Sequence, residues 1–147
     1  MKIHHEALHM KTKERLHFID LTDQISEMVQ QCGIRHGLVN VQTRHTTTAI
    51  LINEHEPLLL GDMQQLLENI APQAQTYQHD NFHIRTVNMC PDERPNGHAH
   101  CRAMLMSSSE TVNILEGTLQ LGRWQRIFLV ELDGEREREV SVMIMGV

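Results

Sequence analysis

The chain has 147 residues, of which 40% are hydrophobic and 22% charged, values typical of one soluble domain that spans residues 1–147. Its net charge of −6 at pH 7 argues against a nucleic-acid binder, and we see neither a signal peptide nor an apolar run near the roughly 20 residues that span a membrane. Three cysteines without C-x-x-C spacing argue against a disulfide framework, so we expect a cytoplasmic protein.

Two short strands and a helix are predicted in the first part of the chain. Alternating apolar residues over 2–10 and 15–19 indicate two strands, which we expect to pair around the polar KTKE turn. Apolar residues then recur at helical spacing between a cap at Thr22 or Asp23 and a terminal glycine, Gly33.

The segment RHTTTAILINEHE, residues 44–56, follows a predicted strand over 38–43 and is rich in β-branched residues, which indicates a buried strand. Its ends are polar, with His45 at the start and Asn53 and Glu54 at the close. At about 3.3 Å per residue, His45 and Glu54 lie about 30 Å apart along a straight strand. The two ends therefore serve different sites or meet across neighbouring subunits, unless they are only the solvated ends of a core strand.

The rest of the chain predicts a helix, a long loop and three strands. Apolar spacing after Pro57 indicates a helix to about Ala71, and residues 73–97 form a polar, histidine-bearing loop of the kind that is often functional. HAHCRAMLMSSS indicates a short helix, and TVNILEGTL, RIFLVELDG and REVSVMIMG indicate strands. The sum is an α+β fold with two main helices and a mixed, mostly antiparallel sheet that curls towards a barrel or sandwich.

Eleven dispersed histidines make a metal site worth considering, although a solvated side chain is the commoner role for any one of them. Three neutral imidazoles with an open fourth position form a typical catalytic zinc site. His79 precedes Asp80, which can orient a ligand imidazole from outside the coordination sphere. His98 and His100 share a side only in an extended segment, because in a helix they diverge by about 200° and only one points inward.

Acidic side chains gather near the start of the second helix. Glu54, Glu56 and Asp62 all fall there, where a carboxylate also complements the helix dipole. We expect that structural role for Glu56. Glu54 and Asp62 remain candidates for proton transfer.

Two arginines and the only tryptophan are candidates for substrate binding. Arg136 and Arg138 share a face in an extended segment and suit a phosphate or carboxylate, although a solvated edge strand explains the alternation of Glu and Arg equally well. Trp124 and Gln125 supply an indole and a neighbouring amide, although a single tryptophan usually packs in a core or an interface.

Long motifs run through most of the chain. They include HTTTAILINE, YQHD, S-x-x-V-x-I-x-x-G-x-x-x-x-G-x-W-Q from Ser109 to Gln125, and E-x-D-G-x-R-x-R-x-V from Glu131 to Val140. With these motifs the chain resembles the YjbQ family, labelled the secondary thiamine-phosphate synthase family. It departs from the family pattern at Arg123, where a threonine usually precedes WQ.

The resemblance implies a small α+β domain that assembles as a homotrimer. Its recurrent histidines suit a divalent metal, zinc first, with nickel and manganese as alternatives. The residues that we predict as site residues are metal ligands His45, His79 and His100, catalytic residues Asn53, Glu54 and Asp62, and substrate-binding residues Arg136, Arg138, Trp124 and Gln125.

The leading hypothesis is a metal-dependent small-molecule enzyme that acts on a phosphorylated substrate, with weak or secondary thiamine-phosphate synthase activity. Dedicated enzymes for that transfer are (β/α)₈ barrels of roughly 250 residues, so any such activity here would come from an unrelated site. One alternative is a non-catalytic trimeric protein that binds a metal or a phosphorylated metabolite. Another is a zinc-type hydrolase, because a three-histidine zinc site beside an acid commonly activates water.

Overall fold

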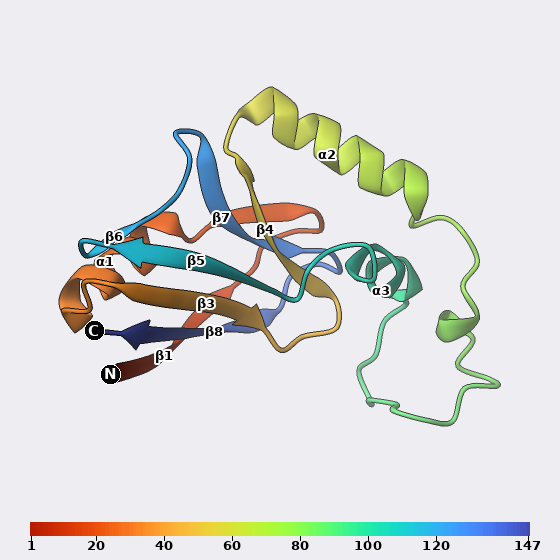
Figure 1. The fold of residues 1–147 in the computed structure, drawn as a ribbon. Coiled ribbons are helices and arrows are strands. Elements are labelled where there is room, and N and C mark those ends of the chain that lie inside the picture. The colour runs from red at the N-terminus through yellow and green to blue at the C-terminus, as the bar shows by residue number, and fades with distance from the viewer.

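The structure is a computed structural model that describes residues 1–147, and the chain forms two β-sheets and three α-helices (Figure 1). The elements in chain order are β1 (Lys2–Lys11), β2 (His17–Asp20), α1 (Thr22–Cys32), β3 (Gly37–Thr43), β4 (Thr48–Glu54), α2 (Pro57–Ile70), the 3₁₀ helix η1 (Gln78–Asp80), α3 (Gly97–Ala103), β5 (Ser109–Leu115), β6 (Thr118–Leu119), β7 (Gln125–Glu131) and β8 (Glu137–Gly146). The larger sheet has the order β1-β8-β3-β5-β6 and the smaller sheet the order β2-β7-β4. The predicted α+β class is confirmed, and every strand pair is antiparallel.

Strand β7 lies at the centre of the core because both of its faces are buried. Ile127 and Leu129 pack in one apolar cluster with α1 and the larger sheet. Phe128 and Val130 point the other way, into a second cluster that includes Leu67 of α2 and residues of α3 and β2. A strand buried on both faces needs apolar residues at successive positions, which explains the continuous run RIFLVEL.

The predicted pairing of the first two strands is wrong. Strand β1 pairs with β8 along its whole length, and β2 pairs with β7 in the other sheet. The KTKE segment between them is therefore a crossing between sheets and not a hairpin turn. Thr12 holds this crossing in place, since its buried hydroxyl donates to Glu131 Oε2 at 2.9 Å and its backbone N–H donates to the Arg136 carbonyl.

Both main helices begin and end close to the predicted residues, but the cap of α1 differs. Gly33 ends α1 with a left-handed φ of 66°, as a glycine stop requires. The N-cap is Leu21 without a side-chain bond, because the Thr22 hydroxyl accepts the Ile127 N–H instead. The expected structural role of Glu56 is confirmed, since its carboxylate accepts from the first backbone N–H groups of α2.

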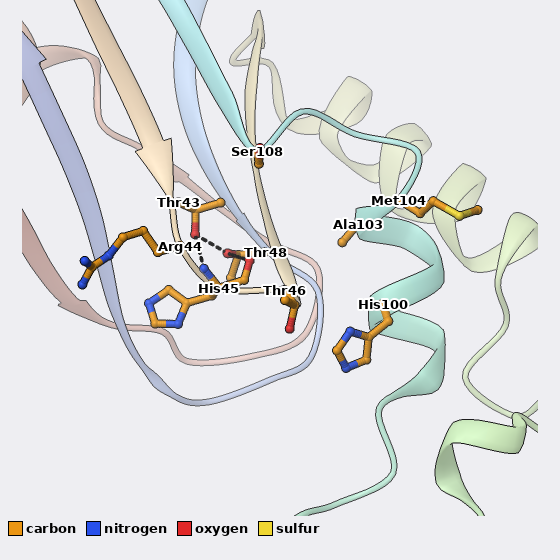
Figure 2. A pocket seen from close by; sticks show the side chains of 9 residues that line it. All are labelled: Thr43, Arg44, His45, Thr46, Thr48, His100, Ala103, Met104 and Ser108. Carbon is orange, nitrogen blue, oxygen red and sulfur yellow. Dashed lines mark hydrogen bonds between the residues drawn. The ribbon is translucent and has the colours of Figure 1, made fainter. Parts of the chain in front are cut away.

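Strand β4 begins at Thr48, so His45 lies in the turn that carries the chain from one sheet to the other. The hydroxyls of Thr43 and Thr48 meet across this turn at 2.6 Å (Figure 2). This contact holds His45 beside α3 and at the edge of the long loop. No helix in the chain combines the length and the apolar character needed to cross a membrane.

Candidate functional site

A cavity of about 580 Å³ lies where the β3–β4 turn, the 79–93 loop, the start of α3 and the start of β8 meet. A smaller hollow shares part of its wall and extends towards Met104 (Figure 2). Apolar side chains are scarce in the cavity wall. Its basic and imidazole side chains are Arg44, His45, His79, Arg85, His100, Arg136 and Arg138, and its carboxylates are Asp92 and Glu93.

His45 is a neutral imidazole whose Nε2 is already in use. Nε2 accepts the backbone N–H of Glu139 at 3.0 Å, which leaves the proton on Nδ1. Burial lowers the pKa of His45, and the nearby Arg138 guanidinium lowers it further. The ring therefore stays uncharged at neutral pH and joins the turn to β8.

Arg85 organises the loop that carries His79. Its Nη1 donates to His79 Nε2 and to the His79 carbonyl, both at 3.0 Å, and its Nη2 donates to both carboxylate oxygens of Glu93 at 2.6 Å. Further bonds run from Arg85 to the carbonyls of Val87 and Asn88. The loop is thus closed around one guanidinium, which also fixes the His79 ring.

His100 is the imidazole of the cavity that makes no hydrogen bond within the protein. Its ring lies 4.5 Å from the His79 ring, and Figure 2 shows it pointing from α3 towards the β3–β4 turn. Burial and the neighbouring His79 lower the pKa of His100. His98, two residues earlier on α3, is only 2% exposed and packs near Tyr77 instead. The two histidines diverge as helical geometry requires.

Arg138 and Arg136 are each held by a buried carboxylate. Arg138 makes a bidentate pair with Glu131, with two bonds of 2.6 Å, and Arg136 Nε donates to Asp133 at 2.6 Å. Arg138 also donates to the Thr47 hydroxyl at 2.9 Å. Three guanidinium nitrogens make no hydrogen bond to a protein atom: both Nη of Arg136 and the Nη1 of Arg138. These nitrogens are oriented N–H donors for a ligand.

The three histidines predicted as metal ligands line one cavity, but they do not fit a metal as they stand. No group of three potential ligands among His, Cys, Asp and Glu comes together to hold an ion. Nε2 of His45 and of His79 accepts a hydrogen bond, so each ring would have to break that bond or move its proton to bind a cation. The metal stays a prediction from the sequence.

The other predicted site residues lie elsewhere. Glu54 and Trp124 line a second cavity at the opposite end of β4, and Gln125 is beside them with its side chain accepting the Gly122 N–H. The Asn53 amide oxygen accepts the Glu54 N–H, and Asp62 is exposed on α2. His45 and Glu54, at the two ends of the segment 44–56, thus line separate cavities of one chain.

The family model described as UPF0047 protein YjbQ-like matches residues 6–147. The chain belongs to this YjbQ-like family. A UPF0047 protein of Methanothermobacter thermautotrophicus is 37% identical over 99% of this chain and 94% of that protein. One from Archaeoglobus fulgidus is 41% identical over 92% and 96%.

The solved structures of YjbQ-like proteins share this fold. A YbjQ-like protein of unknown function from Sulfolobus solfataricus matches with a TM-score of 0.88 at 32% identity, over 99% of both chains. A YjbQ/UPF0047 protein from Clostridium acetobutylicum matches with a TM-score of 0.83 at 34% identity, over 95% of this chain and 99% of that one. These names state no activity, so the function of the YjbQ-like chain has to be argued from its cavity.

Sequence reasoning missed several charged residues in or behind the wall of the YjbQ-like cavity, among them Glu131, Arg85 and Glu93. Glu131 ends the apolar run of β7, and a charge next to a doubly buried strand signals a buried partner such as Arg138. That signal was available in the sequence. Arg85 and Glu93 lie in a loop without periodicity, where no pattern indicates that they pair.

Proposed function

We propose that the cavity binds the phosphate or diphosphate group of a small molecule. The observation that carries the proposal is the pair Arg136 and Arg138, whose guanidinium groups are fixed from behind by carboxylates and keep free N–H groups. A ligand oxyanion that meets donors already in place loses little of its binding energy to ordering them.

The carboxylate partners set how the cavity attracts an anion. Each guanidinium of the wall pairs with an acid, Arg44 with Glu139 among them, so the net local charge is small. Recognition therefore depends on the directions of the N–H groups more than on a long-range field. Planar, bidentate donors of this kind match phosphate oxygens.

His100 adds a proton donor or acceptor to this arrangement. Its ring has no partner within the protein, and its lowered pKa keeps it neutral, with one nitrogen able to donate and the other able to accept. A phosphate oxygen beside the ring would accept its N–H. This residue is our candidate for contact with the reacting group.

The finer proposal is a weak thiamine-phosphate synthase activity. In that reaction the ring nitrogen of a thiazole phosphate forms a bond to the methylene carbon of a pyrimidine methyl diphosphate. The carbon–oxygen bond breaks, its electron pair leaves with the diphosphate, and the ring nitrogen becomes cationic. Arg136 and Arg138 would stabilise the charge that develops on the departing diphosphate. Their placement in one cavity supports this role.

Inorganic pyrophosphate tests the binding step. At 100 times its Kd it should raise the free energy of unfolding by about 2.7 kcal/mol and so raise the Tm. Arg136→Gln should weaken this effect, whereas Arg35→Gln, which removes an exposed arginine paired with Glu116 outside the cavity, should leave it unchanged. Equal Tm shifts in both variants would contradict the proposal.

Product formation separates a transferase from a binding protein. The pure protein is supplied with both thiamine precursors, and thiamine phosphate is measured. A product that disappears in Arg136→Gln supports the transferase. A pyrophosphate-induced rise in Tm without product supports the alternative, a protein that binds a phosphorylated metabolite without turnover.

We also propose that the chain assembles as a homotrimer, as the family resemblance implies. An apolar hollow between α2 and the segment after α3 supports a subunit contact, since Leu66, Ile70 and Leu105 are more than half exposed around it. Contiguous apolar surface of this kind often marks an interface.

A further inference from the structure

A second cavity of about 540 Å³ lies at the opposite end of β4 from His45, and His55 is the one histidine in its wall. Its wall combines the end of β4, the N-terminus of α2 and the turn that precedes β7. The antiparallel register places Glu54 opposite Gln125, so Trp124 is next to the residue that faces Glu54. This cavity shares no residue with the cavity that His45, His79 and His100 line.

Of the three carboxylates in this cavity, Glu54 is the one without a partner. Asp20 accepts from Arg126 Nε at 2.7 Å and contacts His55 Nδ1 at 2.8 Å. Glu56 accepts the two backbone N–H groups that it caps. The Glu54 carboxylate makes neither a hydrogen bond nor an ion pair, although the residue is partly buried. A half-buried, unpaired carboxylate favours a cation close to it.

Trp124 offers an aromatic face in the same cavity. It is 61% exposed, which is unusual for the largest apolar side chain, and it contributes to neither core cluster. The Arg123 guanidinium lies 4.7 Å from the centroid of its ring. The indole therefore already attracts a cation from its own chain, as the negative potential of an aromatic face predicts.

We propose that this second cavity binds a small organic cation, such as a quaternary ammonium group, between Trp124 and Glu54. The indole face supplies the cation–π contact and the carboxylate supplies the opposite charge. Arg123 is a competitor in this arrangement, since its guanidinium covers the indole until a ligand displaces it. This site is separate from the cavity of Arg136 and Arg138, so the cation proposal and the phosphate proposal can each fail alone.

The single tryptophan of the chain gives a direct measurement of this site. Choline chloride is titrated at constant ionic strength while Trp124 fluorescence is recorded, and 3,3-dimethylbutan-1-ol serves as the uncharged probe of the same shape. We expect a saturable change with choline and binding of the alcohol that is weaker by about tenfold, because the alcohol lacks the charge. Equal affinities for the two probes would overturn the proposal.

Three variants test the site. Glu54→Gln should weaken choline binding about fivefold, the scale of a partly exposed ion pair. Glu14→Gln makes the same change at an exposed residue outside the cavity and should leave the affinity unchanged. Arg123→Gln should tighten binding, because it removes the competing cation. Far-UV circular dichroism confirms folding of each variant. Equal weakening in Glu54→Gln and Glu14→Gln, or no tightening in Arg123→Gln, contradicts the site.

Discussion

At the scale of single residues, the Glu131–Arg138 pair links the core to the cavity that His45, His79 and His100 line. Glu131 is fully buried, and besides Arg138 it accepts from the Thr12 hydroxyl and from the backbone N–H of Asp133. One carboxylate therefore joins β7, β8 and the segment that follows β1. It also fixes the direction in which Arg138 presents its free nitrogen.

Glu131→Gln should lower the free energy of unfolding by about 3 kcal/mol or more, because it leaves the Arg138 charge buried without its counter-ion. Urea denaturation measures the loss. Glu135→Gln is the control, since this exposed residue pairs only with Lys11 at the surface and its loss should leave the midpoint nearly unchanged. Equal urea midpoints for Glu131→Gln and Glu135→Gln would show that the buried Glu131–Arg138 pair does not stabilise the folded protein.

The burial of His98 should make the free energy of unfolding depend on pH. Burial lowers the pKa of His98, and the nearby Arg102 and Arg15 lower it further. In the unfolded chain a histidine has a pKa of about 6.5, so as the pH falls below that value the unfolded state gains a proton that the folded state resists. Stability should therefore be constant above about pH 6.5 and fall below it.

Denaturation at several pH values tests this expectation. The slope of the free energy of unfolding against pH gives the number of protons taken up on unfolding, and His98→Gln should reduce that number by up to about one. Part of the slope should remain, because the pKa values of His45 and His100 are also lowered. His83→Gln, in the exposed part of the loop, is the control and should leave the slope unchanged. An unchanged slope in His98→Gln would show that its protonation is not linked to folding.

At the scale of elements, the 79–93 loop is ordered by one side chain. Arg85 is 12% exposed and bonds to three backbone carbonyls and to Glu93, whereas most other side chains from 81 to 92 are exposed. A loop with few buried apolar contacts opens easily when the hydrogen bonds that order it are removed.

Arg85→Lys should increase hydrogen exchange across residues 81–93 and leave exchange in β7 and β8 unchanged, because lysine cannot form the same set of bonds. Mass spectrometry of peptic peptides measures both regions. Arg94→Lys is the matched control, since Arg94 donates to the Glu135 carbonyl outside this loop. Faster exchange throughout the molecule would show global destabilisation, and unchanged exchange in the loop would contradict the role of Arg85.

The sequence predicts individual elements better than their partners. Periodicity indicates α1, α2, β5, β7 and β8, because each depends on the local spacing of its own apolar residues. The run TVNILEGTL was predicted as one strand, but a turn divides it into the antiparallel pair β5 and β6. The partners of β1 and β2 depend on β8 and β7, more than 100 residues away in the chain, and local alternation carries no information about that choice. The start of β4 at Thr48 likewise depends on a turn between two sheets.

The candidate site was predictable only in part. Family resemblance and not spacing selected His45, His79 and His100, and all three line one cavity. Strand geometry indicated that Glu54 lies far from His45 within one chain, and the two residues line different cavities. Periodicity could not indicate the hydrogen bonds that occupy Nε2 of His45 and His79, because these depend on the backbone of β8 and on a side chain within an irregular loop.

At the scale of the whole molecule, the two cavities differ in chemistry and lie at opposite ends of β4. One presents oriented guanidinium and imidazole N–H groups, and the other presents an indole and a free carboxylate. Together they would hold a phosphate-bearing ligand and an organic cation in separate places. A ring of subunits could bring unlike ends of neighbouring chains together, because a head-to-tail contact joins different surfaces.

Sedimentation velocity tests the proposed trimer. The wild type should sediment as a trimer, and Leu66→Lys with Ile70→Lys should shift it towards the monomer by about tenfold or more in dissociation constant, the scale of two lost apolar contacts. Leu115→Lys places the same charge on an exposed residue of β5 and should leave the trimer intact. A wild type that sediments as a monomer would refute the assembly.

A crystal grown with both zinc and pyrophosphate tests the central claim most directly. Anomalous scattering locates zinc, and the electron density locates the anion. We predict pyrophosphate beside His100, Arg136 and Arg138, with the His45–Glu139 and His79–Arg85 hydrogen bonds intact. Zinc bound by His45, His79 and His100 with those bonds broken, and no anion on the arginines, would contradict the account.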